Sequence, residues 1–380
     1  MQIHLAIYHP QHAGILSAAL TLKADKIILL HRKEDDIAGI KSAIQSRGIQ
    51  CESIEVVFDT QLAREQFAFL IETHQSEKLI FNASSGYKKL VLLGFEQFLN
   101  YGYPVFTVDK FTDELNWLGT ESAFGKSTDS DLHLTHELKI QEYLKTFNTQ
   151  VLDQGQKTPE PVRSRNLTQW IIEKIGVYDE AIASLNYMAM MANQSHSYEL
   201  SNHEMKKNHL HEVLMQFQDV GMLTLRGRKL KFTDENTRFY CNGGWLENHV
   251  FSIIYGMRSK RSHISDVAKG MLIVRHQGKV RNELDVVAMS HNRLHIIECK
   301  TRRFSKNTDE NAAASSAIYR LDTIKSLTGG LSGRAMLISY QPLNKYILSR
   351  AKDLGIYCCS HEQLKQLERH LYNFFDAPNK

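Results

Sequence analysis

The chain has 380 residues, which is too long for one ordinary hydrophobic core, so we expect two or three packed units. With 42% hydrophobic and 23% charged residues it has the composition of a soluble globular protein, and no apolar run approaches the roughly 18 residues that a membrane span needs. A net charge of +4 is too small to indicate nucleic-acid binding by itself.

The five cysteines are scattered along the chain, and their spacing is not the paired spacing of a zinc site. The chain opens on a strand-like segment and shows no signal peptide. We therefore expect reduced thiols in a cytoplasmic protein that has no membrane partner.

The first part of the chain, residues 1–152, alternates short apolar runs with helix-like stretches. We expect strands at residues 3–8, 26–31, 53–58, 78–83 and 104–108, and helices at roughly 11–22, 34–48, 61–75 and 87–100. This alternation predicts an α/β fold in which helices cover both faces of a Rossmann-like parallel sheet. Such sheets bind ligands beyond the carboxyl ends of their strands, so the loops after the first and fourth strands are the candidate ligand site.

The loop after the first strand runs from Tyr8 to Gly14 and contains a single glycine. It therefore lacks the GxGxxG turn of dinucleotide-binding enzymes, and the interpretation of the chain as an oxidoreductase loses most of its support. Its polar side chains are those of His9, Gln11 and His12.

The loop after the fourth strand, residues 81–89, has small polar residues that lead into a helix and two lysines. The amides of a helix N-terminus can hold a phosphate group, and the lysines add positive charge there. The alternative is that Asn82 and Ser84 only cap the helix that follows.

This fourth-strand loop resembles that of the CRISPR-associated Rossmann-fold domain, or CARF domain. One departure is Tyr87, which stands with Ser85 and Gly86 where the family often has Gly-Gly-Thr. The residues that follow the family pattern are Asn82, Ser84, Ser85, Gly86 and Lys88.

The CARF resemblance implies that residues 1–152 bind a cyclic oligoadenylate across a homodimer, with the first and fourth loops of each subunit closing on the ring. His9, Gln11 and His12 would then contact the ligand from the first loop. The alternative is that these three are ordinary surface residues of a βα turn.

A polar, proline-containing stretch at residues 153–163 predicts a linker. Helical patterns follow at about 166–176, 178–193 and 203–219, and then two strands turn at Arg226-Gly227 as a basic hairpin. Helices followed by such a hairpin resemble a winged helix, which we expect at residues 164–238. A winged helix can bind DNA or serve as a packing or dimerisation module, and we favour the packing role.

The last part, residues 239–380, contains two strand-like segments joined by a short turn. If His291 and Asn292 form a two-residue loop, Asp285 lies directly opposite Glu298. Two facing carboxylates repel each other unless a cation or a proton neutralises them. Their oxygens suit Mg²⁺ or Mn²⁺, and the backbone carbonyl of Cys299 can supply a further ligand.

Lys300 follows Glu298 by two residues, so its ammonium lies on the same face of the strand as both carboxylates. A bound metal can activate water for phosphodiester hydrolysis, and a lysine can orient that water or stabilise the developing negative charge. The alternative is an ordinary hairpin with surface charges, but Asp285 and Glu298 lie amid valines and isoleucines.

These residues resemble the PD-(D/E)xK nuclease superfamily, with Leu284-Asp285 in place of Pro-Asp. The resemblance implies a restriction-endonuclease-like α/β domain whose catalytic residues are Asp285, Glu298 and Lys300. It also implies an acidic residue from the initial helix, for which Glu247 is the candidate. The alternative for Glu247 is a solvent-facing glutamate that the helix dipole favours in the first turn.

The order of the three parts resembles the CRISPR ancillary nucleases that are activated by cyclic tetra-adenylate. It implies a homodimeric metal-dependent nuclease that cuts single-stranded RNA or DNA or nicks duplex DNA. Two alternatives stay open: a non-catalytic, ligand-responsive regulator that binds DNA through the winged helix, and a repair or restriction nuclease whose first domain binds another nucleotide.

Overall fold

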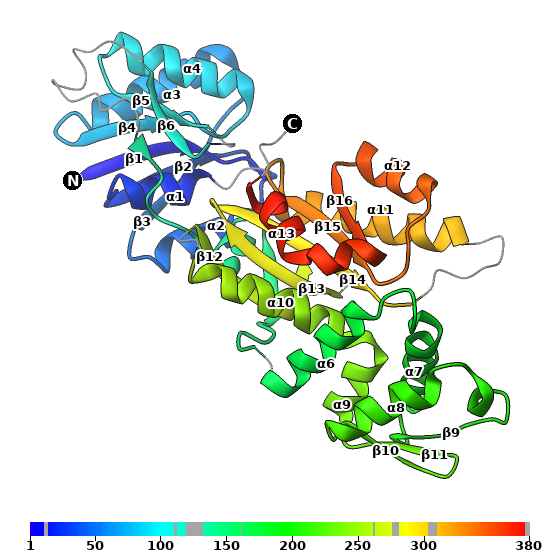
Figure 1. The fold of residues 1–380 in the computed structure, drawn as a ribbon. Helices are drawn as coiled ribbons and strands as arrows, with labels where there is room; N and C mark the ends of the chain where they lie inside the picture. The colour runs from blue at the N-terminus through cyan, green and yellow to red at the C-terminus, as the bar shows by residue number, and fades with distance from the viewer. Residues whose placement is uncertain are drawn as a thin grey trace.

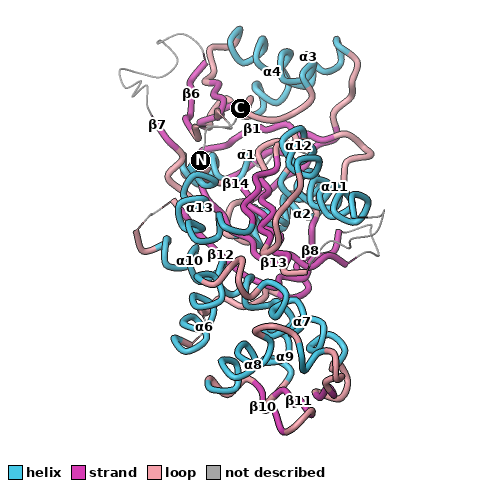
Figure 2. The backbone as a smooth tube through the Cα atoms, turned by 45° about the vertical axis from the view of Figure 1, so that its right-hand side comes forward, coloured by secondary structure: helices cyan, strands magenta, loops and turns pink. Residues whose placement is uncertain are grey.

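The computed structural model describes residues 1–10, 14–109, 112–118, 132–159, 161–260, 263–275, 281–302 and 310–376. Three parts lie in a row, with the N-terminal sheet at one end, the C-terminal sheet in the middle and a mainly helical part at the other end (Figure 1). Figure 2 shows the same order from a second direction. Among the described residues, no helix is long and apolar enough to cross a membrane.

The N-terminal sheet has seven strands in the order β3-β2-β1-β4-β5-β6-β7. The strands from β3 to β5 are parallel to one another, whereas β6 and β7 are antiparallel additions that the sequence patterns did not predict. The strands are β1 (Gln2–Ile7), β2 (Lys26–His31), β3 (Gln50–Glu55), β4 (Lys78–Asn82), β5 (Val105–Val108), β6 (Glu114–Leu118) and β7 (Leu132–His133).

Helices cover both faces of this sheet, as predicted. One face packs against α3 and α4, and the other against α1 and α2. The helices are α1 (Gly14–Thr21), α2 (Ala38–Gln45), α3 (Thr60–Thr73) and α4 (Lys88–Asn100). The third strand lies three residues earlier than predicted, because its pairing with β2 decides its position and its own burial alternates as in an edge strand.

Strands β1 and β4 are neighbours in the sheet, although the chain leaves them toward opposite edges. This is the point at which the strand order reverses, and open α/β sheets bind their ligands there. The two predicted ligand loops therefore lie side by side at the carboxyl ends of β1 and β4.

The C-terminal sheet has six strands in the order β16-β15-β14-β13-β12-β8. Strands β14, β15 and β16 are parallel, and the remaining neighbours are antiparallel. The strands are β8 (Thr149–Asp153), β12 (Ile264–Arg275), β13 (Arg281–Ser290), β14 (Arg293–Lys300), β15 (Arg334–Ser339) and β16 (Ile356–Ser360).

Strand β8 corrects the predicted domain limits. Residues 149–153, which we expected at the end of the first domain and the start of a linker, form the edge strand of the C-terminal sheet and pair with β12. Gln156 continues this contact, since it exchanges two backbone hydrogen bonds with Lys269. The reason is that the edge of β12 leaves hydrogen-bonding groups that the passing chain can pair.

Helices cover both faces of the C-terminal sheet. One face packs against α10 and α13, and the other against α5, α11 and α12. The helices are α5 (Ile140–Thr146), α10 (Trp245–Arg258), α11 (Glu310–Gly329), α12 (Lys345–Asp353), η4 (His361–Gln366) and α13 (Leu367–Asp376). The neighbouring residues Val286 and Val287 belong to different clusters, which is the alternation expected of a sheet buried on both faces.

The middle part is helical and ends in a three-stranded antiparallel sheet of order β10-β11-β9. The predicted basic hairpin is confirmed, with Gly227 and Arg228 between its paired strands. A short helical turn, η2, occupies the start of the third predicted helix, which begins only at Leu210. The elements are α6 (Val162–Glu173), α7 (Asp179–Met191), β9 (Ser197–Glu199), η2 (Glu204–Lys206), α8 (Leu210–Asp219), β10 (Leu223–Arg226), β11 (Lys229–Phe232), α9 (Glu235–Phe239) and η3 (Tyr240–Gly244).

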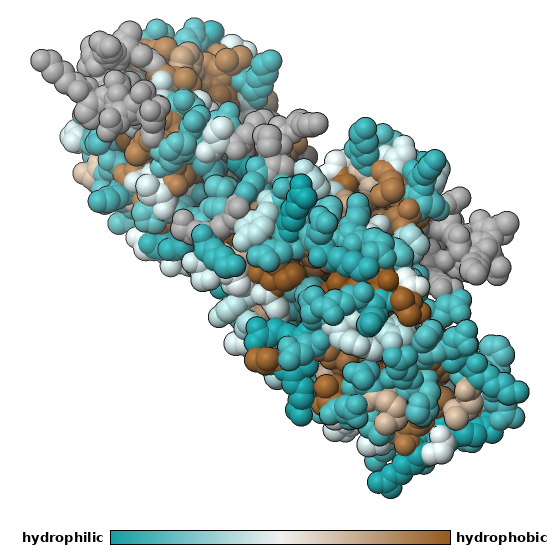
Figure 3. Space-filling model, in the orientation of Figure 1, coloured by the Kyte–Doolittle hydropathy of each residue, from teal (hydrophilic) through white to brown (hydrophobic). Residues whose placement is uncertain are grey.

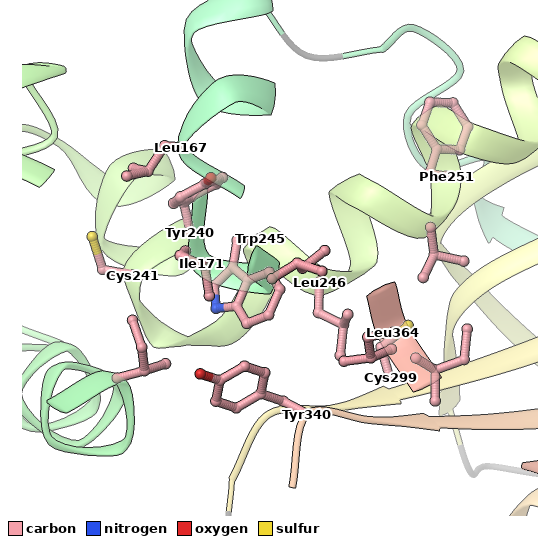
Figure 4. Packing of buried hydrophobic residues seen from close by; sticks show 14 of the residues in the cluster. Leu167, Ile171, Tyr240, Cys241, Trp245, Leu246, Phe251, Cys299, Tyr340 and Leu364 are labelled. Carbon is pink, nitrogen blue, oxygen red and sulfur yellow. The ribbon is translucent and has the colours of Figure 1, made fainter. Parts of the chain in front are cut away.

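One hydrophobic cluster joins the middle part to the C-terminal sheet. Figure 4 shows Trp245 between residues of α6 and the sheet, with Tyr340 facing its ring. The two rings meet edge to face, with centroids 5.3 Å apart. The middle part is therefore packed against the C-terminal sheet.

Candidate active site and ligand-binding loops

The hairpin of β13 and β14 has the register that its turn predicts. Ser290 pairs with Arg293, and the ladder continues to the pair of Val286 and Ile297. His291 and Asn292 form the turn with φ angles of 48° and 51°, the positive values that two-residue hairpin turns of this type require.

Asp285 and Glu298 directly follow the pair of Val286 and Ile297 at that end of the ladder. At this point the hydrogen bond between the two strands is made by a side chain: the amide of Cys299 donates a hydrogen bond of 2.7 Å to Asp285 Oδ2. Asp285 is thereby held against the end of β14, next to Glu298.

Lys300 lies beside both carboxylates, as predicted. Its Nζ is 2.5 Å from Glu298 Oε1 and 3.9 Å from Asp285 Oδ2. Burial alone would lower the pKa of this ammonium, but the charges of Asp285 and Glu298 raise it above its ordinary value. Lys300 is therefore a stable cation within an acidic site.

Glu247 completes the acidic cluster from the first turn of α10. Burial, followed by the negative charge of Asp285, raises its pKa well above the ordinary value. Burial, followed by the charge of Glu298, likewise raises the pKa of Asp285. Glu247 is thus not the fully solvated glutamate of the alternative interpretation, because it lies close enough to Asp285 to feel its charge.

A tight backbone contact brings α10 to this site. Gly243, in the turn before α10, has a φ of 107°, and a Cβ built on it would lie 2.0 Å from Thr301 Oγ1. Thr301 directly follows Lys300, so only a glycine lets the start of α10 approach the end of β14 so closely. Asn242 adds a hydrogen bond of 3.2 Å from Arg302.

The structure adds two charged residues that we did not predict for the site. Glu283 contributes negative charge near Glu247 and Asp285. Lys269 is 7% exposed, hydrogen-bonds to Asn248 through its Nζ, and contributes positive charge near Glu247. The sequence around Lys269 does not indicate which way its side chain points, and only the pairing of β12 with β13 reveals that this lysine points inward.

The oxygen donors at this site fit a hard divalent cation. Asp285 and Glu247 both carry raised pKa values that a nearby positive ion would relieve. Among the described residues, no group of three or more His, Cys, Asp or Glu side chains is placed so that these side chains could hold a metal ion. A metal would therefore be held by Asp285, Glu298 and the Cys299 carbonyl, with water completing its shell, as is common for Mg²⁺.

In the N-terminal domain, the residues of the fourth-strand loop tie it to the neighbouring strands. The carbonyl oxygen of the Asn82 side chain accepts a hydrogen bond of 3.0 Å from the Ser84 amide, and Ser84 Oγ accepts one of 2.9 Å from the Val108 amide. The hydroxyl of Ser85 donates to the Ile7 carbonyl at 2.8 Å.

These contacts contradict the view that Asn82 and Ser84 cap the next helix. Helix α4 has Tyr87 at its N-cap position, without a side-chain hydrogen bond to its amides. Asn82 is fully buried, and its side-chain NH₂ group has no hydrogen-bond partner among the described residues. The two residues shape the loop, and the first turn of α4 has no cap from the side chain of its N-cap residue.

The remaining loop residues surround this helix start. Gly86 lies against the side chain of Ile7 at the end of β1, and Lys88 is exposed at the first position of α4. The ring of His9 meets that of Tyr87 edge to face, with centroids 5.2 Å apart. Gln11 and His12 lie outside the described residues.

Tyr87, which departs from the CARF pattern, is held by charged residues after β2. Its hydroxyl donates to Asp35 at 2.8 Å, and the Arg32 guanidinium lies 4.1 Å from the centre of its ring. Arg32 in turn forms an ion pair with Asp35 at 3.1 Å. The loop after β2 therefore contributes to the mouth of the candidate ligand site.

Comparison with known proteins bears on both sites. Residues 233–377 match the family model of the Card1-like endonuclease domain. A comparison with curated proteins gave no match. The matched residues contain Glu247, Asp285, Glu298 and Lys300.

Solved structures share the fold of the whole chain. The crystal structure of protein VC1899 from Vibrio cholerae has a TM-score of 0.86 and 26% sequence identity, covering 99% of this chain and 98% of that one. Can2 from Sulfobacillus thermosulfidooxidans, solved in complex with cyclic tetra-adenylate (cA4), has a TM-score of 0.81 and 22% identity, covering 99% and 100%.

A Type III CRISPR defence DNA nuclease activated by cyclic oligoadenylate has a TM-score of 0.54 and 14% identity, and the match covers 100% of this chain and 52% of that one. The α/β fold and the resemblance to CRISPR ancillary nucleases are therefore confirmed, and the match to the Card1-like endonuclease model covers residues 233–377.

Proposed function

We propose that this chain is a metal-dependent nuclease that cleaves phosphodiester bonds when a cyclic oligoadenylate occupies the loops of its N-terminal domain. The observation that carries the proposal is the convergence of Asp285, Glu298 and Lys300, with the Lys300 ammonium 2.5 Å from Glu298 and 3.9 Å from Asp285. The family match of residues 233–377 supports the endonuclease activity.

Each residue of the centre has its own role. Asp285 and Glu298 would hold Mg²⁺ or Mn²⁺ together with the Cys299 carbonyl. When bound, such an ion polarises the phosphoryl group and lowers the pKa of a bound water. Lys300 orients the attacking water and stabilises negative charge that develops on the phosphate oxygens. Glu247 adds a further carboxyl group from the helix side of the site.

The activator fits the N-terminal loops for chemical reasons. The amides at the start of α4, which the side chain of Tyr87 does not cap, and the exposed Lys88 can bind a phosphate group, and the rings of Tyr87 and His9 can pack against a base. We propose cyclic tetra-adenylate because Can2, solved with that ligand, shares the fold over the full length of the chain. The candidate contacts are His9, Gln11, His12, Asn82, Ser84, Ser85, Gly86 and Lys88.

The substrate class and the assembly belong to the same proposal. We propose that the enzyme cuts single-stranded RNA or DNA, or nicks duplex DNA. We also propose a homodimer as the active form, since a cyclic ligand with repeated nucleotides suits a site shared by two identical loops. The ligand activates only if it binds the cleaving arrangement of the dimer better than the resting one.

A cleavage assay with Mn²⁺ and cyclic tetra-adenylate tests this proposal. We expect Lys300→Ala and Asp285→Ala to reduce cleavage by at least about 100-fold, because each removes a group that stabilises charge in the transition state. Ligand affinity should stay unchanged. Lys352→Ala, at an exposed lysine of the same domain, is the matched control.

The same assay separates the two sites. Lys88→Ala should weaken activator binding but leave cleavage intact at saturating activator, whereas Lys78→Ala, at the other end of β4, should change neither. Wild-type cleavage by the Lys300→Ala chain would remove that lysine from the mechanism.

A further inference from the structure

The basic hairpin of the middle part has one buried face and one solvent face. The pairing of β10 with β11 places Leu225 opposite Leu230 and Leu223 opposite Phe232, and these apolar side chains pack in the hydrophobic cluster shared with the C-terminal sheet. The alternate positions must therefore point to solvent, because successive side chains of a strand lie on opposite faces.

The solvent face of the hairpin carries three cations. Arg226 is paired with Lys229, and Thr224 with Lys231, and all four residues are exposed. Within the part of the chain that the structure describes, none of the three cations forms an ion pair. Strand β9 adds one acid to this face, Glu199, which is paired with Lys229.

The cross-strand pair of Arg226 and Lys229 places two like charges directly opposite each other. Such a pair destabilises a hairpin unless an anion lies nearby. A hollow of about 490 Å³ lies along the same face, lined by Thr224, Arg226, Lys229, Lys231, Phe232 and Thr233. The face therefore offers both positive charge and room for an anionic chain.

The helix next to this hairpin has a different character. Helix α8, which would enter a DNA groove in a sequence-reading winged helix, contains no lysine or arginine and carries Glu212 and Asp219. Of these two elements, only the hairpin carries lysine or arginine. Contacts from lysine and arginine to phosphates position a nucleic acid without reading its bases.

The hairpin belongs to the part of the molecule that abuts the candidate active site. The turn before α10 contacts Thr301 and Arg302 at the end of β14, through Gly243 and Asn242. Figure 1 shows the hairpin at the far end of the middle part, opposite the N-terminal sheet, and Figure 3 shows mainly hydrophilic residues at that end.

We propose that the solvent face of β10 and β11 is a second nucleic-acid contact, which holds the phosphodiester backbone of a long substrate outside the active site. The proposal rests on the proposed nuclease function and extends it. It assigns Arg226, Lys229 and Lys231 a role in binding the substrate strand irrespective of its sequence. The proposal is compatible with the packing role that we favoured for the middle part, because the buried face of the hairpin still packs in the shared hydrophobic cluster.

Binding of a fluorescent oligonucleotide to the full chain tests the proposal. Two variants are compared. The parent carries Lys300→Ala, which prevents cleavage, and the hairpin variant carries in addition Arg226→Gln, Lys229→Gln and Lys231→Gln. We expect weaker binding and a slope of log affinity against log salt that is smaller by about 2 for a single strand, since three phosphate contacts are lost. RNA, single-stranded DNA and duplex DNA form separate arms.

Two further variants keep this test sharp. Lys352→Gln, Lys365→Gln and Arg369→Gln together remove the same charge from the C-terminal domain and should leave the salt slope unchanged. Glu199→Gln removes the acid opposite Lys229, so it should tighten binding. Equal affinity and equal salt slope for the hairpin variant and its parent would overturn the proposal.

Cleavage separates this inference from the proposed function. In an active background, the hairpin substitutions should raise KM for a long substrate and leave kcat, and cleavage of a short oligonucleotide, unchanged. If the hairpin variant cleaves both long and short substrates as well as its active parent does, the inference is wrong and the proposed nuclease function still holds. A chain that binds through the hairpin but cleaves neither would support the contact and contradict the nuclease.

Discussion

Glu247 illustrates how the proposed catalytic arrangement opposes stability at the scale of one residue. Its carboxyl group is largely removed from water and lies near Asp285 and Glu283, so its ionised form is unfavourable in the folded chain. Lys300 and Lys269 offset only part of this effect. A site that collects negative charge in this way is suited to bind a cation.

Replacing this charge should therefore separate stability from activity. We expect Glu247→Gln to raise the melting temperature of the metal-free protein, because glutamine keeps the side-chain shape and has no carboxyl group whose ionisation the folded chain disfavours. Cleavage with Mn²⁺ should fall. Differential scanning calorimetry in a chelator, beside a cleavage assay, checks both effects, and a melting temperature that drops would contradict the charge argument.

His4 is a second buried group whose protonation affects stability. It is 1% exposed within β1, its ring meets Phe106 at 5.7 Å, and burial lowers its pKa from 6.5 to about 4. The unfolded chain binds a proton at His4 more readily than the folded chain. The contribution of neutral His4 to the free energy of unfolding is therefore fully present above pH 6.5 and is lost as the pH falls toward 4.

The size of this loss follows from the shift. A pKa lowered from 6.5 to about 4 corresponds to about 3 kcal/mol of folding free energy. We expect His4→Leu to reduce the loss of stability between these pH values, whereas His136→Leu, at an exposed site, should not. Urea unfolding at a series of pH values measures the free energy of unfolding of the wild-type chain and of both variants. The same dependence of this free energy on pH in all three proteins would rule the effect out.

At the scale of elements, β8 links segments that are far apart in the chain. It follows α5, pairs with β12, and is continued by the hydrogen bonds between Gln156 and Lys269. Gly155 lies at this contact with a φ of 66°, and a Cβ built on it would lie 2.1 Å from the Lys269 carbonyl oxygen. The strand that carries Lys269 is thus held from both edges.

Gly155→Ala should disrupt this edge. We expect it to destabilise the chain by more than about 1 kcal/mol, because the left-handed backbone is strained for alanine and the new Cβ strikes a backbone oxygen. Gly102→Ala is the matched control, since Gly102 has a φ of 75° and open space around its Cβ position. Equal thermal stabilities of the two variants would mean that the contact contributes nothing.

At the scale of the whole molecule, one hydrophobic cluster runs from the N-terminal sheet into the C-terminal sheet. Helix α5 lies at its centre: Tyr143 donates a hydrogen bond to the Gly329 carbonyl at the end of α11, and Glu142 forms an ion pair with Arg47 after α2. Asn148, just after α5, accepts from the Gly39 amide at 2.9 Å. A shift of α2 on ligand binding would therefore reach the C-terminal sheet.

Asn148→Gly tests this connection. Glycine tolerates the positive φ of 51° at this position, so the substitution removes mainly the side-chain hydrogen bonds. We expect activator affinity to persist while activator-dependent cleavage falls severalfold. Lys23→Gly, at a φ of 57° on the surface, is the control, and full activation of the Asn148→Gly chain would show that signalling takes another route.

Much of the site could be predicted because its determinants lie close together in the chain. The turn residues His291 and Asn292 set the hairpin register, and the register brings Asp285 to Glu298 and Lys300. The two ligand loops were likewise predictable, since the alternation of strands and helices places them at the carboxyl ends of β1 and β4.

Contacts between distant segments were decided only by the tertiary structure. Nothing near residues 149–153 indicates that they pair with β12, and nothing near Lys269 indicates that it points toward Asn248. The same holds for Gly243, whose need for a glycine arises from Thr301. Local patterns encode the period and turns of an element, whereas the partner at its edge depends on how all the elements pack together.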